Sequence, residues 1–523
     1  MSSRSSAGAA IPVIDVFAGP GGLGEGFSAF ADGRGHRPFR IALSIEMDST
    51  AHATLRLRSF YRQFEPGHAP PEYYQRLRGH LTTPELLKLY PRQAEQAVAE
   101  TWRAELGAQN VPVEMVRARV EAALGGREDC VLIGGPPCQA YSLAGRSRNR
   151  GKKGYQLEND PRARLYVEYL QLIADFWPTV FVMENVKGLL SSRLDGRELF
   201  ERIRADLCDP AEAIRREGRG RRRGRKRRYS LRALACPDRQ SEPADFVVRC
   251  EEHGIPQTRH RVIVVGVRED LEHRTLPPLP RSAAPPVAQI IGDLPPLRSA
   301  LSGEADSAES WAGAVLELSS PRWQQRVQEA AGEDVARRIA ALAGARQWME
   351  NLGRGDDVHV PGSPCVHHEH EWFIDERIGG FCNHRSRSHM RSDLHRYVFA
   401  SAYAAVREES PCLSAFPPDL LPDHRNVASA LTHSMFADRF RVQVESKHAT
   451  TITSHISRDG HYYIHYDPRQ CRSLTVREAA RLQTFPDTYF FEGGRTAQYV
   501  QVGNAVPPLL ARQIAGSVAA LLG

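Results

Sequence analysis

Residues 11–24 read Ile-Pro-Val-Ile-Asp-Val-Phe-Ala-Gly-Pro-Gly-Gly-Leu-Gly, an apolar run that passes directly into a glycine-rich turn. The first half, residues 11–17, has little polar alternation, which is typical of a strand buried on both faces in a parallel sheet. Glycines permit tight turns and let the backbone approach a ligand closely. Those in this turn are Gly19, Gly21, Gly22 and Gly24. The stretch predicts a strand, a ligand-binding turn and the start of a helix.

Similar apolar runs recur along the chain and alternate with helical patterns. Further strands are predicted over residues 41–45, 130–133, 180–183 and 262–267. Helices are predicted over residues 164–176, 476–483 and 509–522. Thr475 and Glu478 form a capping box that opens the second of these helices, and Pro507 and Pro508 suit the first turn of the third. Strands that alternate with helices predict an open, doubly wound α/β domain.

Length and composition limit the class of protein. A chain of 523 residues is too long for one ordinary core, so two domains are expected. No uninterrupted apolar run approaches the roughly 18 residues that span a bilayer, and residues 1–10 lack the pattern of a signal peptide. We therefore expect a cytoplasmic protein with no membrane contact. Its nine cysteines are scattered and odd in number, which favours reduced thiols over a disulfide framework.

Polar residues follow the predicted strands where each strand ends. Asp15 and the glycine turn follow the first, Glu46 closes the second, Pro136-Pro137-Cys138 follows the third, and Glu184-Asn185 closes the fourth. Ligands of open α/β sheets bind outside the carboxyl ends of the strands. These residues are therefore expected to face one crevice. Because the glycine spacing departs from the dinucleotide pattern, the turn and Glu46 together suggest an adenosine-containing cofactor, with Glu46 on the ribose.

Cys138 is the candidate nucleophile of this crevice. Two prolines fix the direction of its sulfur, and a thiolate is favoured by nearby cations, for which Arg259 and Arg261 are candidates. Glu184, at an apolar strand end, suits a group that holds or donates a proton. The alternatives are a buried, inert cysteine, a surface glutamate that caps a turn, and two arginines on a solvated strand edge.

The ordered set of motifs resembles the C5-cytosine DNA methyltransferases, chiefly the bacterial modification enzymes. The matching segments are residues 15–27, 135–142, 160–165, 184–186, 254–261, 472–487 and 501–508. The resemblance implies a Rossmann-like domain that uses S-adenosylmethionine, built from residues 1–275 and completed by the return segment 470–523. Residues 276–469, rich in Pro, Ser, Arg and His and weakly periodic, correspond to a target-recognition domain with an irregular fold.

The resemblance also implies a mechanism and a cofactor pocket. A cytosine is flipped out of the duplex, Cys138 adds to its carbon 6, Glu184 holds N3 and the amine, and Arg261 binds O2 with Arg259 in support. Phe17 packs on the adenine and Glu46 binds the ribose. The pocket is lined further by Gly19, Gly21, Gly22, Leu23, Pro137, Leu165, Asn504 and Val506. An acidic residue that reaches the adenine is usual, but Gly79-His80-Leu81 has His there, and Asp48 is a weaker candidate.

The expected partner is double-stranded DNA, bound by a monomer, with a separately encoded restriction endonuclease or other defence proteins. A tRNA cytosine-5 methyltransferase and a non-catalytic DNA-binding homologue are the alternatives. The large middle region argues against the first, and intact Cys138 and Glu184 argue against the second. The glycine turn alone would also fit an NAD enzyme, which would leave the Pro-Pro-Cys loop unexplained. The target sequence is not readable from irregular loops.

Two clusters of unusual composition stand apart from these motifs. Residues 215–228 hold ten Lys or Arg and one Glu, a net +9 against +7 for the whole chain. We predict a loop that contacts DNA phosphates and makes affinity steeply salt-dependent; the alternative is a solvated surface loop. A zinc site is weighed at Cys365, His367, His368, His370, Cys382, His384 and His389. The spacings match no standard finger, so no metal is expected there.

Overall fold

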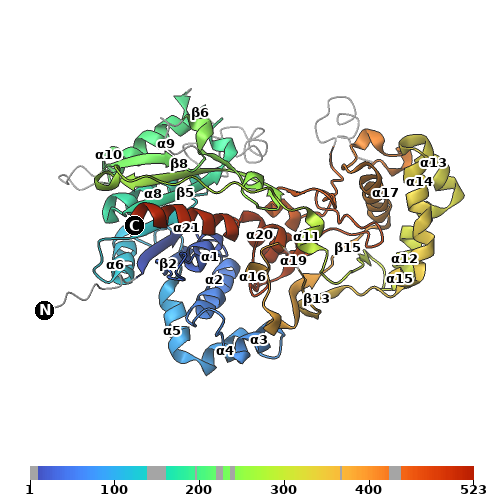
Figure 1. Cartoon of the computed structure of the whole chain (residues 1–523), viewed down its shortest axis with the longest axis horizontal. Helices are drawn as coiled ribbons and strands as arrows, with labels where there is room; N and C mark the ends of the chain where they lie inside the picture. The colour runs from blue at the N-terminus through green and yellow to red at the C-terminus, as the bar shows by residue number, and fades with distance from the viewer. Residues whose placement is uncertain are drawn as a thin grey trace.

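The computed structural model describes residues 10–137, 161–191, 193–194, 197–219, 228–235, 242–365, 368–422 and 438–523. Two lobes are visible, a larger one that holds the central sheet and a smaller helical one at the opposite end (Figure 1). Cys138, His367 and residues 220–227 lie outside the described residues.

The central sheet has eight strands in the order β3-β2-β1-β4-β5-β11-β8, with β9 also paired to β11. Strands β1 to β5 run parallel, whereas β11 runs antiparallel to β5, β8 and β9. The strands are β1 Ile11–Val16, β2 Phe39–Glu46, β3 Thr101–Arg103, β4 Val131–Gly134, β5 Val180–Val186, β8 Tyr229–Ala233, β9 Val247–Arg249 and β11 His260–Arg268. All five predicted strands are confirmed, and β3, β8 and β9 are additional.

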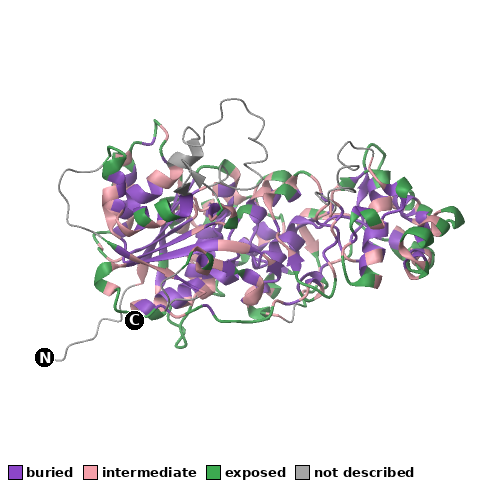
Figure 2. Ribbon diagram, turned by 90° about the horizontal axis from the view of Figure 1, so that it is seen from above, coloured by how far each residue is buried: buried purple, intermediate pink, exposed green. Residues whose placement is uncertain are grey.

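Helices cover both faces of this sheet, as a doubly wound fold requires. Helices α1 (Gly22–Ala29) and α21 (Pro508–Leu522) share a core with Val13 and Ile133 on one face. Helices α6 (Val113–Leu124), α8 (Pro161–Phe176) and α9 (Leu199–Cys208) share a core with Ile14 and Leu132 on the other. The predicted α/β class is confirmed, and buried strands run through the middle of the large lobe (Figure 2).

The end of the chain returns to the first helix. Helices α19 (Val476–Leu482) and α20 (Arg495–Asn504) precede α21, and the predicted capping box of Thr475 and Glu478 is formed. A Cβ on Gly26 of α1 would lie 2.4 Å from the Cβ of Ala511 in α21, so glycine permits this close packing.

The last two helices of the chain bear on the expectation that it has no membrane contact. The stretch Arg495–Leu522, which is α20 and α21, is long and apolar enough to cross a membrane by length and composition. However, 67% of its most apolar window is buried inside the protein. Packing against the sheet and α1 accounts for this composition.

Helices are inserted between β2 and β4 and occupy the long interval between Glu46 and Cys130. Before α6 they are α2 (Ser49–Arg62), α3 (Pro71–Leu77), α4 (Thr83–Leu89) and α5 (Pro91–Glu100). They share a hydrophobic cluster with Ile378 and Cys382 of the middle region. The insertion therefore links the sheet to the rest of the chain.

The middle region is more helical than its weak periodicity indicated. Its main helices are α12 (Ala308–Leu316), α13 (Pro321–Ala331), α14 (Glu333–Ala340), α15 (Arg346–Glu350) and α17 (Arg391–Arg407). They enclose a separate core around Trp311 and Tyr397. Short strand pairs, among them β13 (Gly355–Pro361) with β14 (Gly380–Arg385), connect this core to the large lobe. Parts of the region nonetheless pack in the sheet's own core, as Phe373 and Ala449 do.

Candidate active site at the carboxyl edge of the sheet

Glu46 and the glycine turn meet at the carboxyl edge of β1 and β2. The Glu46 carboxylate accepts hydrogen bonds from the backbone N–H of Gly19 (2.7 Å) and of Asp48 (2.7 Å). Burial raises the pKa of Glu46, while these N–H groups lower it. Each carboxylate oxygen keeps a further lone pair. Glu46, the residue predicted to bind the ribose, is thus held against the glycine turn with which it was expected to form the cofactor site.

The turn itself has a left-handed backbone conformation that residues other than glycine rarely adopt. Gly19 (φ 58°) and Gly21 (φ 101°) are left-handed, and so is Phe17 (φ 56°), a non-glycine residue in a strained conformation. Gly22 faces the return segment, where an added Cβ would lie 2.2 Å from the carbonyl oxygen of Val506. The structure therefore brings Phe17, the glycines and Val506 together.

The other predicted cofactor residues differ in exposure. Leu23 is buried in the core of the α1 face beside Val506. Pro137 and Leu165 are half-buried, and Asn504 is exposed at the end of α20. Asn504 can therefore meet a ligand, whereas Leu23 supports the pocket from behind.

The catalytic candidates Glu184 and Arg261 form an ion pair, with Arg261 Nε 2.9 Å from Glu184 Oε1. Their side chains are 15% and 13% exposed. Antiparallel pairing of β11 with β5 sets this contact, since Arg261 lies opposite Val186 and Ile263 opposite Glu184. The pair is therefore positioned by the sheet itself and not by a loop.

Arg259 has different partners. Its guanidinium is 1% exposed and donates to the carbonyl oxygens of Ile452 (2.8 Å), Ala505 (2.8 Å) and Gly503 (3.3 Å). Burial and the nearby charge of Arg261 lower the pKa of Arg259 to about 9, so it is still charged at neutral pH. The two arginines predicted to share one site thus bind different groups.

Asn185 was expected at the crevice as part of the Glu184-Asn185 strand end, but no role was assigned to it. Its Nδ2 donates to the carbonyl oxygen of Pro136 (3.2 Å), and its Oδ1 accepts from the N–H of Val186 (2.9 Å). A Cβ on Gly135 would lie 2.8 Å from Glu184 Oε2, so the loop that leads to Cys138 starts directly against Glu184. The signal in the sequence for a role of Asn185 was its position next to Glu184 at the end of a predicted strand.

The two segments considered for the adenine contact have other partners, although the Asp48 backbone N–H binds Glu46 at the crevice. Asp48 caps α2 by accepting from the N–H groups of Thr50 and Ala51. Gly79, next to His80, packs on Val358 of the middle region. The strand that completes this edge is instead β3, at whose carboxyl end Ala104 N–H donates to Glu46 O (3.1 Å).

Two side chains beside this strand end are exposed. Glu105 follows Ala104, and Met47, which is 52% exposed, follows Glu46. The sequence did not predict the position of Glu105, because β3 is only three residues long and lies between inserted helices, so it shows no apolar run.

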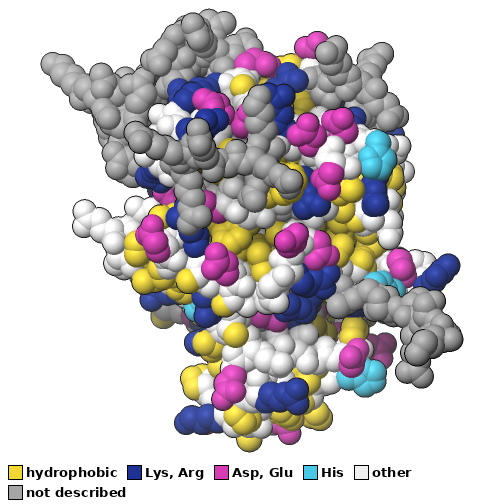
Figure 3. Space-filling view, turned by 90° about the vertical axis from the view of Figure 1, so that its left-hand side faces the viewer, with side chains coloured by type: hydrophobic (Ala, Val, Ile, Leu, Met, Phe, Trp, Pro, Cys, Tyr) yellow, Lys and Arg dark blue, Asp and Glu magenta, His cyan; other side chains and the backbone are white. Residues whose placement is uncertain are grey.

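The described part of the basic run is paired with acidic side chains. Arg216 contacts Asp206 (2.5 Å), Arg219 contacts Glu168 (2.5 Å), and Arg215 contacts Glu212. Basic and acidic side chains are interspersed on the visible surface of the large lobe (Figure 3). The phosphate-contacting hypothesis therefore concerns residues 220–227, outside the described residues.

The described members of the Cys and His cluster considered for zinc do not converge on one point. His384 bonds Thr475 Oγ1 and the Pro295 carbonyl (both 2.9 Å), and Cys382 donates to Leu77 O. Across the described residues, no group of three or more His, Cys, Asp or Glu could hold a metal ion.

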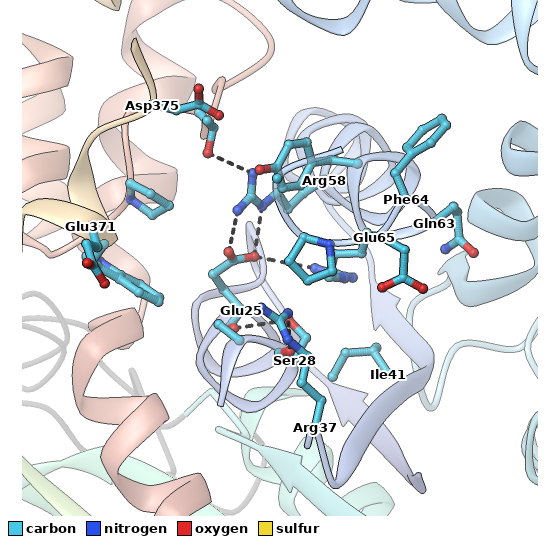
Figure 4. A pocket seen from close by; sticks show the side chains of 18 of the residues that line it. Glu25, Ser28, Arg37, Ile41, Arg58, Gln63, Phe64, Glu65, Glu371 and Asp375 are labelled. Atoms are coloured by element: carbon cyan, nitrogen blue, oxygen red, sulfur yellow. Dashed lines mark hydrogen bonds and ion pairs between the residues drawn. The ribbon is translucent and has the colours of Figure 1, made fainter. Parts of the chain in front are cut away.

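A cavity of about 750 Å³ lies away from this crevice, beside the start of β2 and the carboxyl ends of α1 and α2. Arg58 forms a bidentate pair with Glu25 at its wall (2.5 and 2.9 Å), and Glu371 and Asp375 face them from the middle region (Figure 4). Two groups of ion pairs line it, Glu25 with Arg58 and Arg62, and Asp375 with Arg377.

Comparison with known proteins identifies the family. The model of the C-5 cytosine-specific DNA methylases matches residues 91–208 and 246–520. The type II methyltransferase M.Bpa9945I of Bacillus paralicheniformis is 30% identical over 97% of this chain and 98% of its own length. The type II methyltransferase M.AgeI of Thalassovita gelatinovora is 25% identical over the same shares of both chains.

A third relative is the DNA (cytosine-5-)-methyltransferase M.ApeKI of Aeropyrum pernix, which is 25% identical over 76% of this chain and 83% of its own. Both segments matched by the family model include the site: the first contains β4 and β5, and the second contains Arg261 and the return segment. The chain therefore belongs to the C-5 cytosine-specific DNA methylase family and is a DNA cytosine-5 methyltransferase.

Proposed function

We propose that this enzyme methylates carbon 5 of a cytosine flipped out of a specific duplex DNA sequence, through a covalent adduct with Cys138. The observation that carries the proposal is the Glu184–Arg261 ion pair, held by the sheet beside the loop that leads to Cys138. A carboxylate and a guanidinium at 2.9 Å present complementary groups to one edge of a pyrimidine.

The roles of the side chains follow from the chemistry of the ring. The Cys138 thiolate adds to carbon 6 and breaks the carbon 5–carbon 6 double bond, so electron density moves toward carbon 5 and the O2 and N3 edge. Glu184 holds N3 and the exocyclic amine, and Arg261 offsets the charge that develops at O2. Carbon 5 would take the methyl group of S-adenosylmethionine, with S-adenosylhomocysteine as the leaving group. A water molecule then takes the carbon 5 proton, and the electrons of that C–H bond re-form the carbon 5–carbon 6 double bond as Cys138 leaves as its thiolate.

The cofactor of this reaction is S-adenosylmethionine, which supplies an electrophilic methyl group when bound. The chain fits it, because a Cβ on Gly19 would meet nothing within 4 Å, which leaves the turn open to a ligand, and Glu46 binds the N–H of the same residue. Glu46 would bind the ribose, Phe17 would pack on the adenine, and Asn504 would bind the amino-acid end. Glu105 would take the acidic position expected at the adenine amine. Met47 would make an apolar contact with the face of the adenine ring opposite Phe17.

The middle region would read the target sequence, and residues 1–275 with 470–523 would form the catalytic domain. We place the enzyme in a restriction-modification system, as the names of its relatives suggest, acting as a monomer in the cytoplasm beside a separately encoded endonuclease. Phage defence is the wider class to which this role belongs.

Transfer of a labelled methyl group from S-adenosylmethionine to unmethylated plasmid DNA tests the proposal. Wild-type protein should label the plasmid, while Cys138→Ala and Glu184→Gln variants of equal thermal stability should not. Labelling of tRNA in preference to DNA would support the alternative substrate. DNA binding without transfer by the wild type would support the non-catalytic homologue.

A further inference from the structure

Arg259 is the cation that the proposed mechanism does not need. It is fully buried, and its four hydrogen bonds all go to backbone carbonyls, those of Ile452, Gly503 and Ala505. No carboxylate of the described chain hydrogen-bonds this guanidinium. The Glu184 charge favours the charged guanidinium, but burial and Arg261 outweigh it. A buried charge is costly to keep without a directly bonded acidic partner, so its place between three carbonyls requires an explanation.

These carbonyls belong to two segments that are distant in sequence. Ile452 follows β16 (Ala449–Thr450), the strand by which the middle region returns to the large lobe, and β16 pairs in parallel with β10 (Gln257–Thr258). Gly503 and Ala505 flank Asn504 of the proposed cofactor pocket. Arg259 thus links the middle region directly to the cofactor loop.

Neighbouring glutamines reinforce the same link. Gln257 accepts from Ile452 N–H (3.1 Å) and donates to the Leu482 carbonyl (2.8 Å) and to Gln483 Oε1 (2.5 Å). Gln483 in turn donates to the Ala505 carbonyl, which Arg259 also binds. The segments are in close contact, since a Cβ on Gly503 would lie 2.2 Å from the backbone N of Ser454.

The next residue of the loop reaches the glycine turn. Val506 meets Gly22 through the carbonyl oxygen that an added Cβ would strike. A chain of direct contacts therefore runs from Ile452 through Arg259 to residues 503–506 and from there to the glycine turn. Close-packed elements of this kind move as discrete units, not by gradual deformation.

We propose that Arg259 is a positioning residue that couples DNA binding by the middle region to cofactor binding at residues 503–506. The inference rests on the proposed function, because it takes the middle region as the DNA-binding part and this loop as part of the cofactor site. Coupling between two ligands is reciprocal, and it typically amounts to about 5- to 150-fold in affinity. Duplex DNA should therefore tighten cofactor binding, and the cofactor should tighten DNA binding.

The guanidinium is suited to this task by its shape. Its planar fork offers five N–H donors in fixed directions, whereas lysine offers a point charge on a flexible stem. Arg259→Lys should therefore keep the charge but hold one carbonyl instead of three. This makes lysine the informative substitution, because a role in charge alone would be preserved.

A matched control exists in Arg477. It is equally buried and also donates to three backbone carbonyls, those of Cys382, Pro486 and Tyr489, none of which belongs to residues 503–506, although it differs from Arg259 in its ion pair with Asp487 (3.6 Å). Arg477→Lys should lower thermal stability while leaving the DNA-induced gain in cofactor affinity as in the wild type. Gln483→Met, which removes the second donor to Ala505, provides a milder perturbation of the coupling if Arg259→Lys does not fold.

The experiment measures the dissociation constant of S-adenosylhomocysteine by calorimetry, with and without fragments of unmethylated plasmid DNA, together with KM and kcat for methyl transfer. We expect Arg259→Lys to raise the cofactor KM about tenfold, to change kcat less than about threefold, and to bring the DNA-induced gain in cofactor affinity close to one.

Two results would overturn the proposal. One is a fall in kcat at unchanged KM, which would place Arg259 at the reacting base. The other is a loss of stability equal to that of Arg477→Lys with wild-type coupling. A wild type that transfers no methyl group to DNA would instead defeat the proposed function. The cofactor titration without DNA would then still test whether Arg259 holds residues 503–506.

Discussion

The close contact between Gly22 and Val506 can be tested by adding a single methyl group in the variant Gly22→Ala. The variant asks whether the return segment packs against the glycine turn. Gly22 lies in α1 with ordinary helical dihedrals, so alanine adds no backbone strain and would otherwise favour the helix by about 1 kcal/mol. The added Cβ would lie 2.2 Å from the Val506 carbonyl oxygen and 3.3 Å from its carbonyl carbon and nitrogen. Backbone on both sides must move apart, and overpacking of this kind costs about 1–3 kcal/mol.

The two effects can be read separately for Gly22→Ala. Chemical denaturation should show a decrease of about 1–3 kcal/mol in the free energy of unfolding, and calorimetry should show weaker S-adenosylhomocysteine binding, with each 1.4 kcal/mol equal to about tenfold. Gly26→Ala, which meets Ala511 and Arg512 of α21 farther along α1, should be destabilised to a similar extent with less effect on the cofactor. Gly33→Ala, with nothing within 4 Å, should be close to wild type. Wild-type stability and cofactor affinity in Gly22→Ala would refute the close approach of the return segment to the glycine turn.

Further predictions concern buried charges, pH and salt. Glu25→Ala should lower the free energy of unfolding by about 3–5 kcal/mol, because it leaves Arg58 buried without its bidentate partner. Asp32→Ala, on an exposed turn, is the control. Equal destabilisation of both variants would contradict this account. Burial lowers the pKa of His384 and of His465 to about 4, below the roughly 6.5 of an unfolded chain. The unfolded state therefore binds more protons between about pH 6.5 and 4, so stability should fall as pH falls through this window, by up to about 3 kcal/mol for each histidine. His384→Gln should flatten the slope of urea midpoint against pH, and an unchanged slope would assign the destabilisation to other groups. Deleting residues 220–227, which hold six Lys or Arg, should reduce the dependence of DNA affinity on log salt by about 0.9 for each phosphate that the shortened protein no longer neutralises, and an unchanged slope in filter-binding titrations would leave the basic run as a solvated loop.

The elements that the sequence predicted are those with strong local signals. Buried strands such as β1 and β5 are continuous apolar runs, and the α19 capping box is a short-range pattern, so both were visible without tertiary information. The positions of Glu46 and Glu184 followed from one topological rule, because parallel strands bring their carboxyl ends to one edge.

Features that depend on long-range contacts could not be predicted in the same way. β3 is three residues long and exists because β2 offers it an edge, so the position of Glu105 was not visible. Arg259 and Arg261 are two residues apart, yet one binds carbonyls that lie far away in sequence and the other binds Glu184. Their spacing in the sequence predicted one shared site. Their different partners became visible only once the fold placed residues 449–453 and 503–505 against Arg259.

The middle region shows a related limit. Its helices α13 and α14 are short and end at Gly332 and at a turn, so periodicity over a longer window was weak although Val327, Val335 and Ile339 are fully buried. Propensity and pattern are summed over windows longer than these helices, which is why the region seemed irregular.

Bisulfite sequencing of plasmid DNA from cells that make this protein tests the central claim most directly. With wild-type protein, cytosines within one short recurring sequence should resist conversion, and with Cys138→Ala all cytosines should convert. Protection that persists in Cys138→Ala, or uniform conversion with active, folded wild-type protein, would contradict methylation of DNA cytosine through a Cys138 adduct.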